Sequence, residues 1–138
     1  MALTGGCFCG AVRYAAEGPP RFRGQCFCRT CQMLSGGAGN MFLVVQASGF
    51  AYAKGRPKSF ARTDGAPTRD FCETCGVHLT ACSPLAPGVV LIKVGTLDDP
   101  AVFGGPEAVY WTGEKQEFHL LPPGVPAHER PKPQAPRP

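Results

Sequence analysis

The sequence of 138 residues has no apolar run long enough to cross a bilayer, and it carries little charge. Its longest apolar stretch, Val89 to Val94, is interrupted by Lys93, whereas a membrane-spanning helix needs about 20 apolar residues. Only 17% of the residues are charged and 43% are apolar, a balance typical of a globular chain with a core of modest size. We therefore expect one globular domain and no membrane partner.

The chain also lacks the features of a secreted or a nucleic-acid-binding protein. Met1 to Gly6 has neither the charged start nor the apolar run of a signal peptide. The formal net charge is +4, but Arg130, Lys132 and Arg137 belong to a proline-rich tail, and the remainder is close to neutral. No run of Lys or Arg alternates with aromatic residues. We expect a cytoplasmic protein without a nucleic-acid partner.

Cysteine, in contrast, is plentiful, with eight residues in the chain. Cys26 to Cys31 forms a CxCxxC cluster, Cys7 and Cys9 form a CxC pair, and Cys72 and Cys75 form a CxxC pair. Eight cysteines can make four disulfides in a small secreted chain. A CxC pair, however, closes a disulfide only with strain, whereas one metal ion can collect sulfurs at these spacings. The pattern favours metal binding.

The clustered cysteines divide into a closed set of four and an open set of three. A structural zinc takes four ligands, usually as two short pairs, while a catalytic zinc keeps three protein ligands and one open position. We expect the closed set to hold a structural zinc: Cys7, Cys9, Cys72 and Cys75. We expect the open set to hold a second zinc: Cys26, Cys28 and Cys31. The alternative for the open set is a second structural zinc completed by Cys82, a histidine or water.

Four other residues have both a structural and a functional interpretation. Arg29 lies inside the CxCxxC cluster, where its guanidinium can meet an anionic ligand or offset the charge of the thiolates. Cys82 is expected to be a small buried residue of a strand. His78 and His119 are expected at the surface or in the core, and His78 lies near enough to the CxxC pair to support it.

Frequent turn residues between short apolar segments predict an all-β domain with very little helix. The expected strands are residues 11–15, 21–26, 40–45, 50–55, 59–63, 68–71, 77–82, 89–94 and 109–111. One helical turn is expected over Cys28 to Leu34, before Ser35-Gly36-Gly37 stops it. The domain should span residues 1–126, and residues 127–138, rich in proline, should be disordered.

Four motifs together resemble a known family. They are Gly5 to Tyr14 (GGCFCGAVRY), Cys26 to Cys31 (CFCRTC) with Ser35-Gly36, Phe71 to Gly76 (FCETCG) and Val94 to Pro100 (VGTLDDP). This order resembles the glutathione-dependent formaldehyde-activating enzyme family, whose domain is shared with centromere protein V. The resemblance runs from about Gly5 to Trp111. It implies a twisted two-sheet β-tent fold with zinc on both cysteine sets.

The resemblance also implies a function. The family's founding activity is the addition of glutathione to formaldehyde, which gives S-hydroxymethylglutathione, and its members are classed as carbon–sulfur lyases. Glutathione would then be a co-substrate. Arg29, Thr30 and Ser35 are the polar residues that the sequence places beside the open zinc position, and we expect them to contact the tripeptide. Members often carry His where this chain has Phe27. A non-catalytic, zinc-stabilised binding module is the alternative, and a homo-oligomer is left open.

Overall fold

The computed structural model describes residues 2–130, which form two compact units. Of these residues, the first unit contains 2–23 and 42–104, and the second contains 24–41 and 105–130. Strands β3 (Phe22–Cys26) and β4 (Asn40–Gln46) each begin in one unit and end in the other. Each unit is described by itself below.

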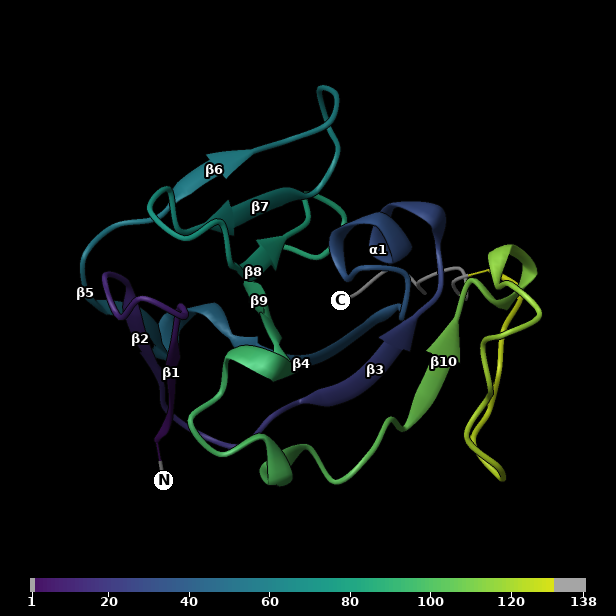
Figure 1. The fold of residues 1–138 in the computed structure, drawn as a ribbon. Helices are drawn as coiled ribbons and strands as arrows, with labels where there is room; N and C mark the ends of the chain where they lie inside the picture. Colours follow the sequence, from purple (N-terminus) through teal and green to yellow (C-terminus); the bar gives the residue numbers. More distant parts are fainter. Residues whose placement is uncertain (1, 131–138) are drawn as a thin grey trace. The chain divides into compact units, whose positions relative to one another are not determined.

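The described chain is mostly strand with one short α-helix, as Figure 1 shows. The strands lie in two sheets, of three and seven strands, so the predicted all-β, two-sheet class is confirmed. The remaining strands are β1 (Leu3–Gly6), β2 (Arg13–Ala16), β5 (Phe50–Lys54), β6 (Lys58–Phe60), β7 (Thr68–Phe71), β8 (His78–Cys82), β9 (Val89–Lys93) and β10 (Ala108–Tyr110). Helix α1 spans Arg29–Leu34. No helix in this part of the chain is long and apolar enough to cross a membrane.

The smaller sheet of the first unit has the antiparallel order β1-β2-β5 (Figure 1). Along β2, Tyr14 and Ala16 are buried while Arg13 and Ala15 are partly exposed, which is the alternation of a strand with one face against the core. Strand β1 was not predicted, because its glycines have a low strand propensity. Gly5 is nevertheless required there, for a reason given below.

The first unit also contains the antiparallel series β4-β9-β8-β7-β6. Strands β4, β8 and β9 each contribute buried residues to the core, and Leu43, Leu79 and Ile92 are fully buried. They belong to one apolar core that also includes two cysteines of the closed set, Cys7 and Cys72. Packing of the strands therefore brings the two cysteine pairs to the edge of the same core.

In the second unit, β10 pairs in parallel with the end of β3, and this pairing is extended by the Phe27 N–H, which donates to the Tyr110 carbonyl at 3.0 Å. Beyond β10 the chain returns, and His128 N–H donates to the Val109 carbonyl at 2.8 Å. The Tyr110 and His128 rings also stack, with centroids 5.4 Å apart. The start of the segment predicted to be disordered is thus paired with a strand, while residues 131–138 lie outside the described residues.

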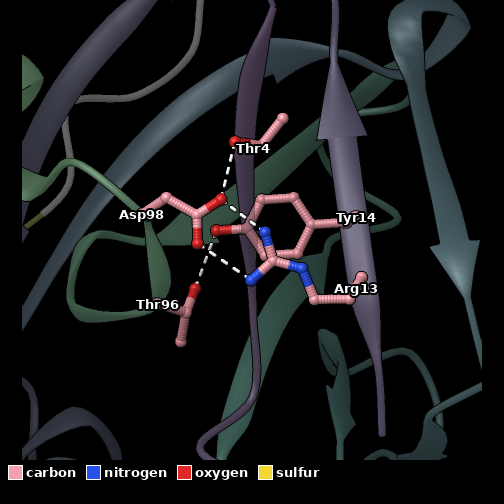
Figure 2. Close-up of polar contacts among 5 residues, drawn as sticks. All are labelled: Thr4, Arg13, Tyr14, Thr96 and Asp98. Atoms are coloured by element: carbon pink, nitrogen blue, oxygen red, sulfur yellow. Dashed lines mark hydrogen bonds and ion pairs between the residues drawn. The ribbon is translucent and has the colours of Figure 1, made fainter. Parts of the chain in front are cut away.

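A polar clamp joins β1 and β2 to the turn that follows β9 (Figure 2). Arg13 makes two hydrogen bonds to the Asp98 carboxylate, and the Thr4 hydroxyl donates to the same carboxylate at 2.7 Å. The Tyr14 and Thr96 hydroxyl oxygens are 2.8 Å apart, and the Thr96 hydroxyl donates to a backbone carbonyl. Through Thr96 and Asp98, the VGTLDDP motif therefore fixes β1 and β2 to the turn that follows β9.

The clamp explains why β1 contains glycine at its third position. A Cβ atom on Gly5 would lie 2.3 Å from the Thr96 carbonyl oxygen and 2.3 Å from the Tyr14 hydroxyl. Backbone cannot move away as a flexible side chain can, so we expect Gly5→Ala to cost about 2 kcal/mol or more. Gly95→Ala is the control, because a Cβ there meets nothing within 4 Å. Urea unfolding checks both, and equal stability of the two variants would contradict the close approach.

Asp98 should contribute to stability in a pH-dependent way. Hydrogen bonds from Arg13 and Thr4 lower the pKa of Asp98 from 3.8 to about 2. Because the pKa is lower in the folded state, the stabilisation is present above about pH 4 and is lost as the pH falls towards 2. The side chains of Arg13 and Asp98 are 37% and 45% exposed, so we expect Asp98→Asn to cost about 1 kcal/mol or less at pH 7.

Urea unfolding of the wild type and Asp98→Asn at pH 7, 5 and 3 measures this contribution. The difference between their free energies of unfolding should be the same at pH 7 and pH 5 and should shrink at pH 3. Acid effects common to both proteins cancel in this difference. Asp64→Asn, in the exposed turn between β6 and β7, is the control and should differ little from the wild type at any pH. A difference for Asp98→Asn that stays constant across the range would contradict the assignment.

Candidate metal centres

The closed cysteine set is assembled from two loops of the first unit. Cys7 and Cys9 lie between β1 and β2, and Cys72 and Cys75 lie between β7 and β8. All four sulfurs lie within 4.8 Å of one another. In both loops the second cysteine is followed by a glycine with positive φ, 77° at Gly10 and 79° at Gly76, a conformation that glycine adopts without strain. These glycines let each loop turn back after presenting its sulfurs.

The sulfur spacing of this set fits a tetrahedral ion. Cys9 Sγ lies 3.6 Å from Cys7 Sγ and 3.7 Å from Cys72 Sγ. A tetrahedral zinc with Zn–S bonds of about 2.3 Å separates its sulfurs by roughly 3.8 Å. The Val12 N–H also donates to Cys7 Sγ at 3.3 Å. Burial raises the pKa of Cys7, but this N–H and the neighbouring thiols outweigh it and lower the pKa to about 6, which favours the thiolate that a metal needs.

The open set is formed within the second unit, where β3 ends and α1 begins. Cys26 is the last residue of β3, Cys28 directly precedes α1, and Cys31 lies in its first turn. The Cys31 N–H donates to Cys28 Sγ at 3.4 Å, so Cys28 caps the helix. The three sulfurs lie within 4.8 Å of one another. Within residues 2–130, no further Cys, His, Asp or Glu is part of this group.

The cysteines of the open set differ in how readily their thiols lose a proton. Hydrogen bonds from the Cys26 and Cys31 thiols, followed by backbone N–H groups, lower the pKa of Cys28 to about 2. Interactions with Cys28 and Cys31, together with burial, raise the pKa of Cys26 far above its ordinary value. The cluster therefore accommodates one negative charge readily and resists a second. A bound cation removes that resistance, because it offsets the repulsion among thiolates. This donor set fits a metal ion with three sulfur ligands.

The sequence singled out Arg29, Thr30 and Ser35 as ligand contacts, and the structure places all three on or beside α1. Arg29 is exposed. Its backbone N–H donates to Glu114 Oε2 at 2.6 Å, and its Nη1 donates to Gln32 Oε1 at 2.6 Å. The Ser35 hydroxyl is turned towards the Gln32 carbonyl at 3.4 Å. Their contact with a ligand stays a prediction.

Gln32 is the site residue that sequence reasoning missed. It is 2% exposed, and its Nε2 donates to the Phe27 carbonyl at 2.7 Å and the Glu114 carbonyl at 2.8 Å. Its Oε1 accepts from Arg29 and from Gln116 Nε2. Gln32 thus fastens α1, and with it Cys31, to the segment after β10. The only sign of this role in the sequence is the position of Gln32 directly after the CxxC sequence that ends at Cys31.

Cys82 does not complete either set. It was predicted to be buried, but it is exposed at the end of β8 and belongs to neither cluster. A strand end faces solvent more than a strand centre, and this explains the error. His78 instead packs against the Phe60 and Phe71 rings, with centroids 5.7 and 5.8 Å away. None of the eight cysteines forms a disulfide in this structure.

The fold and the two sulfur clusters define a small β protein built around candidate metal centres. The family profile described as glutathione-dependent formaldehyde-activating enzyme matches residues 2–114. Because this match covers most of the 138 residues, the chain belongs to that family.

A solved structure supports the same fold. The crystal structure of a protein from Rhodobacter sphaeroides superposes with a TM-score of 0.62 at 20% sequence identity. The match covers 75% of this chain and 96% of that chain. At this identity the similarity establishes the fold and carries no statement about substrate.

Proposed function

We propose that the protein is a zinc-dependent enzyme of the carbon–sulfur lyase type that forms or breaks glutathione adducts of small aldehydes, such as S-hydroxymethylglutathione. The observation that carries the proposal is the difference between the two sulfur clusters. One has four sulfurs at tetrahedral spacing, and the other has three. Four ligands are typical of a structural zinc, and three leave room for a thiol substrate. Membership of the family supports glutathione as that thiol.

The reaction is a reversible addition. The thiol sulfur bonds to the aldehyde carbon, the carbon–oxygen π bond breaks, and the thiol proton ends on the oxygen to give a hydroxyl group. In the reverse direction the hydroxyl proton returns and the sulfur leaves. A zinc ion, when bound, supplies stabilisation of the substrate thiolate at neutral pH. Because three thiolates leave such a site with a net charge of about minus one, activation of the thiol is favoured over polarisation of the aldehyde.

The chain's own residues have separate tasks in this proposal. Cys26, Cys28 and Cys31 hold the ion at the end of β3 and the start of α1. Arg29 is exposed beside them, and part of its guanidinium is held by Gln32. Its remaining N–H groups suit a carboxylate of the tripeptide. Thr30 and Ser35 offer hydroxyl groups on the same short helix and its end.

The test is metal content together with catalysis. We expect about two zinc ions per chain, one of which a mild chelator removes, with about three thiols becoming reactive. Removal should abolish the acceleration of S-hydroxymethylglutathione formation and breakdown, measured by NMR exchange above the spontaneous rate, and zinc should restore it. X-ray absorption should show one more sulfur ligand when glutathione is added. Two chelator-resistant ions with no acceleration would instead identify a non-catalytic, zinc-stabilised binding module.

A further inference from the structure

Trp111, the residue that follows β10, has a backbone conformation that its surroundings must hold in place. Within residues 2–130 it is the only residue other than glycine with a positive φ, and its φ is 58° and its ψ 37°. This left-handed conformation costs free energy in a residue with a bulky side chain. It persists only where the surrounding structure determines it, and such residues cluster at functional sites. The contacts on either side of Trp111 show what its conformation positions.

Hydrogen bonds fix the chain on both sides of Trp111. Before it, the Tyr110 carbonyl accepts from the Phe27 N–H at 3.0 Å. Directly after it, the N–H of the next residue donates to the His128 carbonyl at 3.1 Å. The Trp111 carbonyl accepts from the Glu114 N–H at 3.1 Å. The left-handed residue thus turns the chain from β10 into a short 3₁₀-helix that ends at Glu114.

Glu114 is the residue that this turn brings to the open cysteine set, which lies in the same unit. Its side-chain Oε2 accepts from the Arg29 N–H at 2.6 Å, and its backbone carbonyl accepts from Gln32 Nε2 at 2.8 Å. Arg29 directly follows Cys28, and Gln32 directly follows Cys31. Glu114 therefore holds the chain next to two of the three sulfurs.

The chain between the first two cysteines of the open set is held as well. Phe27 lies between Cys26 and Cys28, its N–H donates to the Tyr110 carbonyl, and its carbonyl accepts from Gln32 Nε2 at 2.7 Å. Hydrogen bonds thus fix the backbone along the whole cluster. Three sulfurs make fewer bonds to an ion than four, so fixing them in advance matters more, because it reduces the entropy lost when the ion binds.

We propose that Glu114 is a positioning residue of the open set and that the left-handed Trp111 places it there, so that three sulfurs retain an ion that they would otherwise release readily. Neither residue supplies a ligand atom, since the group consists of Cys26, Cys28 and Cys31. The inference rests on the proposed function only in taking the open set as a zinc site. It adds to that function the contacts that keep the site assembled.

The test measures metal retention in the zinc-loaded full chain, without glutathione or aldehyde. The protein is treated with a chelator at rising concentration, and the thiols that become reactive are alkylated and located by mass spectrometry, which follows the two sets separately. Glu114→Ala should release the ion of the open set at a chelator concentration about tenfold lower or less. The closed set should be unchanged, because it lies in the other unit.

Two further variants separate the contact from a general loss of stability. Glu114→Gln keeps an oxygen that accepts from the Arg29 N–H, so it should restore most of the retention. Glu117→Ala is the control, because Glu117 is an exposed acidic residue of the same segment, and it should behave as the wild type. Wild-type retention in Glu114→Ala, or an open set that stays reactive in the zinc-loaded wild type, would overturn the proposal.

Two substitutions at Trp111 test its backbone conformation. Asn adopts a positive φ more readily than most residues, whereas a β-branched residue strongly disfavours it. Trp111→Val should therefore release the ion of the open set about tenfold more readily than Trp111→Asn. Both lack the indole ring, so the difference reports on the backbone, and equal release would refute the role of Trp111. Absence of catalysis in a wild type that retains both ions would refute the proposed function and leave this result standing.

Discussion

Cys72→Ser should lower the unfolding temperature of the protein by more than 10 °C and release about one metal ion per chain. Cys72 is 1% exposed and belongs to the core of the first unit. Its sulfur lies 3.7 Å from that of Cys9, a residue 63 positions away in sequence. Metal binding at such a set joins distant loops, and in small domains it supplies much of the folding free energy. A serine hydroxyl is a poor zinc ligand and would itself be buried without a partner.

Thermal unfolding by circular dichroism and metal analysis of the purified variant measure this effect. Cys82→Ser is the matched control, because Cys82 is exposed and outside both clusters. It should retain all the metal and change stability by about 0.5 kcal/mol or less. If Cys72→Ser and Cys82→Ser unfolded alike with equal metal content, the structural role of the four-sulfur set would be wrong.

Cys31→Ser should have the opposite profile, with a large loss of activity and a small loss of stability. Cys31 contributes one of only three sulfurs to the open set, and two remaining thiolates hold zinc weakly. We expect the second ion to be lost and the exchange of S-hydroxymethylglutathione to fall at least 100-fold. The four-sulfur set lies in the other unit, so its ion should be retained.

Metal analysis, NMR exchange and thermal unfolding on one sample separate these effects. Met33→Ala is the control on the same helix, since Met33 is 76% exposed and two residues from Cys31. It should keep both ions and the activity. Unchanged exchange in a Cys31→Ser protein that has lost its second ion would remove the catalytic role from the open set, and the binding module would then be favoured.

Much of this architecture was predictable from local patterns. Alternation in residues 11–15 and the apolar run over residues 89–94 predicted two strands, and the structure has strands at Arg13–Ala16 and Val89–Lys93. Such strands can be predicted because burial of one or both faces sets the pattern of apolar residues along the sequence. Cysteine spacing likewise predicted two separate sulfur groups, and each group is assembled as expected. A short pair such as Cys72 and Cys75 needs only its own turn to bring its sulfurs together.

Other features depended on contacts between residues distant in sequence. Strand β1 was missed because Gly5 is selected by the close approach of Thr96 and Tyr14, which no local pattern shows. The same holds for Gln32, whose partners Phe27 and Glu114 lie before and far beyond it in the chain.

The sequence by itself thus determined the all-β class, the two cysteine groups and the family, since strand alternation and cysteine spacing are properties of neighbouring residues. Tertiary structure alone decided the exposure of Cys82, the clamp on Asp98 and the hydrogen bonds of Gln32. The physical reason is that burial and hydrogen-bond partnership depend on which distant segments pack together. The hydrogen bonds of a polar side chain such as that of Gln32 are known only once its surroundings are in place.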